Sequence, residues 1–147
     1  MDNQNLKFDF VFLGQSVLKY QVPLDIFTTI NQIYEQNYHN LERANGQLVG
    51  KIENEHSLFY HGKDQTKMKN HNMFPQNVTD YFMSIFNHYL TFNKIRDYDT
   101  HLNSIWVNEM KQHEYNPAHI HRGMLFTGLS SVMILKLPST FGKEYSA

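Results

Sequence analysis

The chain has 147 residues with no cysteine, and its 13 Lys and Arg against 14 Asp and Glu give a formal net charge of −1. This length fits one domain spanning residues 1–147, and the lack of cysteine excludes disulfide frameworks, thiolate zinc sites and cysteine nucleophiles. The near-zero charge without a basic cluster argues against nucleic acid as the primary partner. The polar first residues and the lack of any stretch of roughly 18 apolar residues predict a cytoplasmic protein with no membrane partner.

The first 73 residues predict a hairpin, a helix and a long loop. Residues 8–12 alternate polar and apolar side chains, and residues 16–22 form a second short strand after a tight turn. Pro23 suits the first position of a helix, and the apolar spacing after it predicts a helix that ends near residue 38. Residues 39–73 show no clear period, so we expect a long loop with at most one short strand. A loop of this length is typical of a functional lid.

The second half predicts one more helix and two long strands. Pro75 and the apolar spacing that follows it predict a helix over residues 76–92. Residues 102–111 carry apolar side chains on both faces, which is typical of a strand covered on both sides, and residues 129–137 form a second apolar, β-branched run. This order is typical of an α+β, mainly β fold in which two helices pack on one face of a mostly antiparallel sheet.

Histidine is abundant, with nine copies in the chain. Six of them lie in polar surroundings and are expected to be solvated surface imidazoles, namely His39, His56, His61, His71, His88 and His101. His119 and His121 differ because residues i and i+2 of a strand point to the same side. Two imidazoles at this spacing converge on one point, as a pair of metal ligands must.

The surroundings of this pair carry a longer pattern. Its members, in chain order, are Trp106, Asn108, Asn116, His119, His121, Leu129, Ser130, Val132 and Pro138. The pattern resembles the W-x-N, N-x-x-H-x-H and L-S-x-V signature of a group of iron(II)/2-oxoglutarate-dependent oxygenases from bacteria and tailed phages. The resemblance implies a double-stranded β-helix, or jelly roll, with N-terminal helices packed on its larger sheet.

The resemblance also implies a site and a reaction. His119 would be the first iron(II) ligand and His121 the second, in the position where most such oxygenases have a carboxylate. Asn116 and Tyr115 would orient the turn or contact the cosubstrate, 2-oxoglutarate. The family hydroxylates an unactivated C–H bond, and the substrate, whether small molecule, peptidyl side chain or nucleobase, stays open. Because the distal His and Arg of the family have no match here, residues 1–147 are expected to be the N-terminal portion of the domain.

Three other interpretations stay open. A cupin-like metal protein also uses H-x-H on a jelly-roll strand, but it normally adds a Glu three to four residues later, where this chain has Met124 and Leu125. His113 with the pair at 119 and 121 would form a three-His zinc site, with Glu114 as base. The third interpretation is a non-catalytic interaction domain with a degenerate site. Separately, an unfinished sheet would expose an edge strand that a second copy of the chain could cover, which would favour a homo-oligomer.

Overall fold

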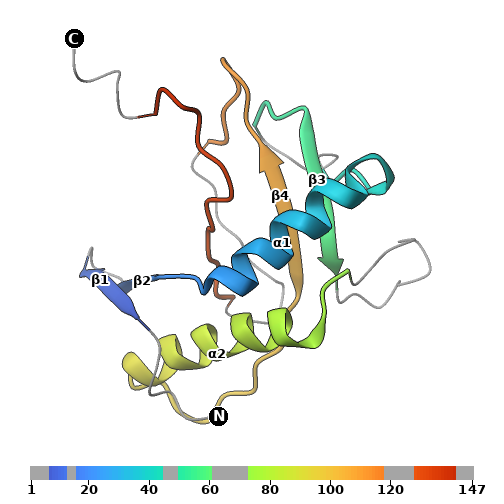
Figure 1. Ribbon diagram of the computed structural model, residues 1–147. Helices are drawn as coiled ribbons and strands as arrows, with labels where there is room; N and C mark the ends of the chain where they lie inside the picture. Colours follow the sequence, from blue (N-terminus) through green and yellow to red (C-terminus); the bar gives the residue numbers. More distant parts are fainter. Residues whose placement is uncertain (1–6, 13–15, 45–49, 61–72, 118–127, 142–147) are drawn as a thin grey trace.

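The computed structural model describes residues 7–12, 16–44, 50–60, 73–117 and 128–141. Its regular elements are, in order, β1 (Phe8–Phe12), β2 (Ser16–Tyr20), α1 (Leu24–Asn37), the 3₁₀ turn η2 (Tyr38–Asn40), β3 (Asn54–Tyr60), α2 (Gln76–Phe92) and β4 (Ser104–Glu109). β1 pairs with β2 and β3 pairs with β4, each antiparallel (Figure 1). A jelly roll needs more strands than these described residues supply, so the double-stranded β-helix stays a prediction.

The predicted hairpin is confirmed, and it docks on the second helix. In the β1–β2 ladder Phe8 lies opposite Tyr20. The rings of both residues contact His88 of α2, and Phe8 also meets Phe92 edge to face. The Tyr20 hydroxyl lies 2.7 Å from Nδ1 of His88, so this imidazole is a packing group of the hairpin rather than the solvated residue we expected.

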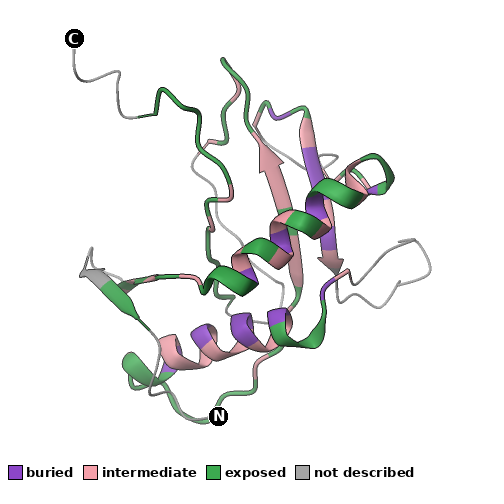
Figure 2. Cartoon of the chain, in the orientation of Figure 1, coloured by how far each residue is buried: buried purple, intermediate pink, exposed green. Residues whose placement is uncertain are grey.

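Both helices are confirmed, and they cover one face of the β3–β4 pair (Figures 1 and 2). A proline precedes each one, where its missing N–H costs no helical hydrogen bond. The buried core consists of Ile26, Ile30, Tyr34, Leu41, Leu58, Phe74, Val78, Tyr81, Phe82 and Ile85. Among the described residues, no helix combines the length and apolar character needed to cross a bilayer.

β3 lies inside the segment expected to be a loop. The short strand anticipated there is present and runs for seven residues. Its register against β4 shifts between Ser57 and Phe59, so that Leu58 and Phe59 both contact the core beneath the helices. Two buried polar residues, Glu55 and His56, interrupt the apolar alternation, which is why the sequence pattern did not indicate this strand in full.

Two strand expectations need correction. Within the described residues 128–141 there is no strand, because no described segment forms a ladder with the predicted run at 129–137. Met133 and Leu135 pack against the core, while Val132 is 88% exposed. The strand predicted over 102–111 is β4, and its outer face is more open than expected, since Trp106 is 37% exposed.

Candidate functional site

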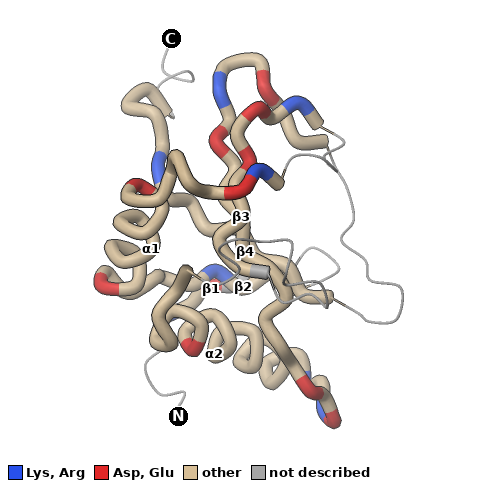
Figure 3. Tube along the Cα trace, turned by 90° about the vertical axis from the view of Figure 1, so that its right-hand side faces the viewer, with Lys and Arg blue, Asp and Glu red and all other residues tan. Residues whose placement is uncertain are grey.

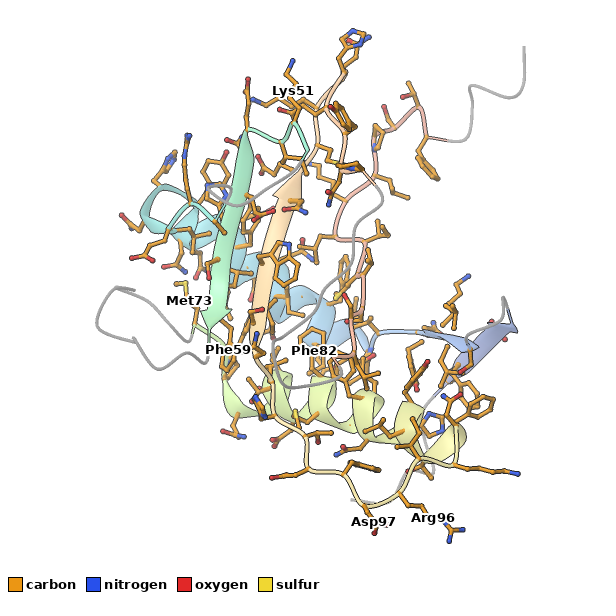
Figure 4. All side chains as sticks on the ribbon, turned by 180° about the vertical axis from the view of Figure 1, so that it is seen from behind. Lys51, Phe59, Met73, Phe82, Arg96 and Asp97 are labelled. Atoms are coloured by element: carbon orange, nitrogen blue, oxygen red, sulfur yellow. The ribbon has the colours of Figure 1, made fainter. Side chains whose placement is uncertain are left out.

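The turn before the histidine pair is fastened to the residues that lead into β3. The backbone N–H of Lys51 donates to the Tyr115 carbonyl at 3.0 Å, and the Tyr115 N–H donates back to the Lys51 carbonyl at 3.1 Å. This two-way exchange forms an isolated antiparallel bridge outside the named strands. Figure 4 shows Lys51 just before the start of β3, on the view from behind the helices. The backbone that leads to His119 is therefore anchored four residues before it.

A carboxylate reinforces the same junction. One oxygen of Glu114 accepts the backbone N–H of Lys111 at 2.7 Å, and the other accepts the backbone N–H of Glu53 at 3.0 Å. The Lys111 ammonium in turn lies 3.0 Å from the Glu53 carboxylate. Figure 3 shows charged residues gathered at this end of the β3–β4 pair. We call Glu53, Lys111 and Glu114, with the Lys51–Tyr115 bridge, the turn clamp.

The clamp holds Glu114 in its ionised form. The hydrogen bond from the Lys111 backbone lowers the pKa of Glu114 most, the one from Glu53 lowers it further, and partial burial opposes both. A general base needs a free lone pair and a pKa near the working pH. Each Glu114 oxygen already accepts a backbone N–H, and its pKa lies below the ordinary value, so these contacts do not favour it as the base of a three-His zinc site.

Gly50 lies against the same turn, on the segment that leads into β3. A Cβ atom at this position would overlap the carbonyl oxygen of Tyr115 and would lie 2.8 Å from Cδ of Pro117. Only glycine therefore lets the two backbones approach this closely. The close approach places the segment that leads into β3 directly against the turn that contains Tyr115 and Asn116.

The residues expected at the site divide into two groups. Tyr115 is 58% exposed and Asn116 is exposed as well, and the structure records no side-chain partner for either among the described residues. His119 and His121 lie outside the described residues. Among those that are described, no three His, Asp or Glu side chains gather closely enough to hold a metal ion. The structure thus brings Tyr115 together with Lys51 and Asn116 close to Gly50, and the metal pair stays a prediction.

The face of β3–β4 that the helices leave uncovered carries a polar set. Ile105 and Val107 contact the core beneath the helices, so the alternating residues Trp106 and Asn108 face the opposite side. Asn108 lies opposite Glu55, which is only 6% exposed. The Asn108 side-chain oxygen is buried and has no hydrogen-bond partner among the described residues. These residues form the helix-free face, and two of them belong to the W-x-N motif.

A second polar group lies beneath α1, and no sequence motif indicated it. The Tyr34 hydroxyl lies 3.2 Å from Nδ1 of His56, which is 4% exposed. The Tyr38 hydroxyl donates to the Glu109 carboxylate at 3.1 Å, and the Asn54 amide donates to the same carboxylate at 3.1 Å. We call these five residues the α1 polar cluster. His56 was expected on the surface, and its burial corrects that expectation.

Burial sets the protonation of this cluster. Desolvation lowers the pKa of His56, the Arg43 charge lowers it further, and the Glu109 carboxylate partly offsets both. Desolvation also raises the pKa of Tyr34, with Glu109 adding to the rise. At neutral pH the cluster therefore holds a neutral imidazole and neutral phenols around one carboxylate. Its contacts join α1 to the β3–β4 pair.

No protein-family model, curated protein or solved structure matches the chain.

Proposed function

We propose that this chain is part of an iron(II)/2-oxoglutarate-dependent oxygenase in which His119 and His121 bind the iron. The proposal rests first on the spacing of the two imidazoles, which are ligands that iron(II) accepts readily. A bound iron with 2-oxoglutarate and O₂ would supply the oxidation of a C–H bond. The residues of this chain would bind, orient and shield the reactants.

The observation that carries the proposal furthest is the turn clamp. Metal ligands must be held on a stiff backbone, and Tyr115 is fixed to Lys51 by two backbone hydrogen bonds. The pair at 119 and 121 follows this anchor directly along the chain. A loose surface segment with two chance histidines would need no such anchor.

The helix-free face fits the same proposal. The unpartnered oxygen of Asn108 is a buried hydrogen-bond acceptor, which a bound molecule or an ordered water would satisfy. Trp106, on the same face, offers a large apolar surface that would exclude water from a reaction site. The core and the helices lie on the other side, so a molecule that contacts Trp106 and Asn108 would approach from this face.

Iron binding to the full chain tests the proposal. Equilibrium dialysis with iron(II) under anaerobic conditions would compare the wild type, His119→Ala and a control, His101→Ala, which removes an exposed imidazole. We expect His119→Ala to weaken iron binding at least about tenfold and His101→Ala to leave it unchanged. Equal iron affinity in the wild type and His119→Ala would overturn the proposal and favour a non-catalytic interaction domain.

A further inference from the structure

We propose that residues 129–137 form an interaction edge at which a second copy of this chain adds as an antiparallel strand, with the two-fold axis at Met133. This edge does not include the proposed iron ligands, and the pairing does not depend on them. All of its residues belong to the described segment 128–141.

The backbone of this edge has no partner within the part of the chain that the structure describes. β1 pairs with β2 and β3 pairs with β4, so no named strand takes up its hydrogen-bonding groups. Within residues 128–141 the Phe141 N–H donates to the Pro138 carbonyl, and both of these residues lie beyond the edge. A strand with unpaired N–H and C=O groups is a template on which another chain can pair.

The interaction edge is seated on the protein by one of its faces. Met133 and Leu135 pack against the buried core, and residues at this spacing share one side of an extended chain. Val132 and Ile134, on the other side, are exposed, as Figure 2 shows for most of this segment. Because the core already holds the edge, pairing costs less entropy than ordering a loose tail.

The order of the apolar side chains identifies a second copy as the partner. In an antiparallel ladder centred on Met133, Val132 lies opposite Ile134 of the second copy. Leu129 lies opposite Leu137 in the same ladder, and both of these leucines are exposed. Each pair occurs twice, as a two-fold interface requires. Apolar cross-strand pairs stabilise a ladder, so the edge is complementary to itself.

The charges of the edge fit the same register. Lys136 is the single charged residue between positions 129 and 137, and it lies opposite Ser130 instead of its own copy. Natural edge strands are commonly protected from pairing by lysines, prolines or bulges. This edge contains no proline, and Pro138, which lacks an N–H, ends the ladder directly after it. The formal net charge of −1 means that two copies repel each other only weakly.

Sedimentation equilibrium of the full chain tests the pairing. We expect the wild type to change from monomer to dimer between about 1 and 100 µM, the range in which an interface of micromolar affinity dissociates. Val132→Lys places a charge opposite Ile134 and diagonal to Lys136 of the second copy, so it should weaken dimerisation at least about tenfold. Val17→Lys is the matched control at an exposed valine of β2, and it should dimerise as the wild type does.

Single cysteines test the register, because the chain has no cysteine of its own. In Met133→Cys the two thiols face each other across the two-fold axis, with Cα atoms roughly 4.5–5.5 Å apart, which a disulfide can span. In Val132→Cys the two thiols are diagonal neighbours roughly 7–8 Å apart, which is too far. We therefore expect mild oxidation to cross-link Met133→Cys more completely, although Val132 is the more exposed side chain.

The opposite results would overturn the proposal. A wild type that stays monomeric at about 100 µM, or a Val132→Lys variant that dimerises as tightly as the wild type, would refute pairing at this edge. Cross-linking of Val132→Cys that equals or exceeds that of Met133→Cys would refute the register. Should Val132→Lys not fold, as judged by its far-UV circular dichroism, the two cysteine variants decide the question.

Discussion

His113 occupies a backbone conformation that a glycine would adopt more easily. Its φ is +67°, in the left-handed region, and it is the third residue of a turn closed by the Glu114 N–H donating to the Lys111 carbonyl at 3.1 Å. A residue with a Cβ is sterically strained in this conformation. Glycine avoids the strain, but it loses more chain entropy on folding. The turn inside the clamp therefore stores a small amount of strain at an exposed residue.

Replacing His113 tests this strain. We expect His113→Gly to raise the free energy of unfolding by about 0.5–1 kcal/mol, the steric gain less the entropic cost. His113→Val should lower it by about 1 kcal/mol, because a β-branched residue tolerates positive φ poorly. Urea denaturation followed by circular dichroism would measure both variants. A loss of stability in His113→Gly would contradict the argument, and a loss of zinc binding in that variant would instead support the three-His site.

At the scale of single residues, the sequence predicted the candidate site in part. The spacing of His119 and His121 and the W-x-N motif are local patterns, so they could be recognised without a fold. The residues of the turn clamp could not be recognised in this way, because Glu53 and Glu114 are 61 positions apart and come together only in the folded chain. His56 was misjudged for the same reason, since its neighbours in sequence are polar and its burial comes from α1.

Among the elements, the contact between α1 and β3 depends on a neutral histidine. Nδ1 of His56 lies against the Tyr34 hydroxyl, and burial holds the pKa of His56 below its ordinary value of 6.5. In the unfolded chain the same imidazole is solvated, so it binds a proton at a higher pH than it does in the folded state. The groups that face His56 are Tyr34 and Tyr38 from the helix side, Glu109 from β4, and Arg43.

The sign of the pH effect follows from this difference. Below about pH 6.5 the unfolded state takes up more protons than the folded state, so the free energy of unfolding falls as the pH drops from 6.5 to the lower folded pKa. We expect His56→Asn, which keeps an acceptor for Tyr34, to have a flatter stability profile in this range. Urea titrations between pH 5 and 8 would show it, with His101→Asn as the exposed control. Parallel profiles for the wild type and His56→Asn would refute the argument.

The helices were predictable because their apolar spacing is local, and α2 has the bounds that the sequence predicts. Strands depend on partners far along the chain. β3 contains the buried polar residues Glu55 and His56, so its pattern did not alternate cleanly. The run at 129–137 has strand composition, but pairing requires a neighbouring edge, and no described segment pairs with it. The composition of residues 129–137 therefore predicted a strand that the structure does not form among its described residues.

In the molecule as a whole, the two faces of the β3–β4 pair differ in character. One face meets α1 and α2 through the apolar core (Figures 1 and 2). The other carries Trp106, Asn108 and Glu55. The first face supplies stability through buried apolar area. The second bears polar groups, among them the unpartnered side-chain oxygen of Asn108, and the proposed ligand would lie on that side.

Leu58 tests whether the helices and the β3–β4 pair unfold as one unit. Its side chain is fully buried at the centre of the core, so Leu58→Ala should lower the free energy of unfolding by about 2–5 kcal/mol. Leu24→Ala is the matched control, because Leu24 is 78% exposed and its truncation should change stability by less than about 0.5 kcal/mol.

Two probes would follow the unfolding of both variants. Far-UV circular dichroism is dominated by α1 and α2, and the single tryptophan, Trp106, reports on β4 by fluorescence. Because one core joins all three elements, the two transitions should coincide in the wild type and shift together in Leu58→Ala. A shift in the dichroism midpoint alone would mean that the helices unfold without β4, and the core would then not connect the two layers as the packing of Leu58 indicates.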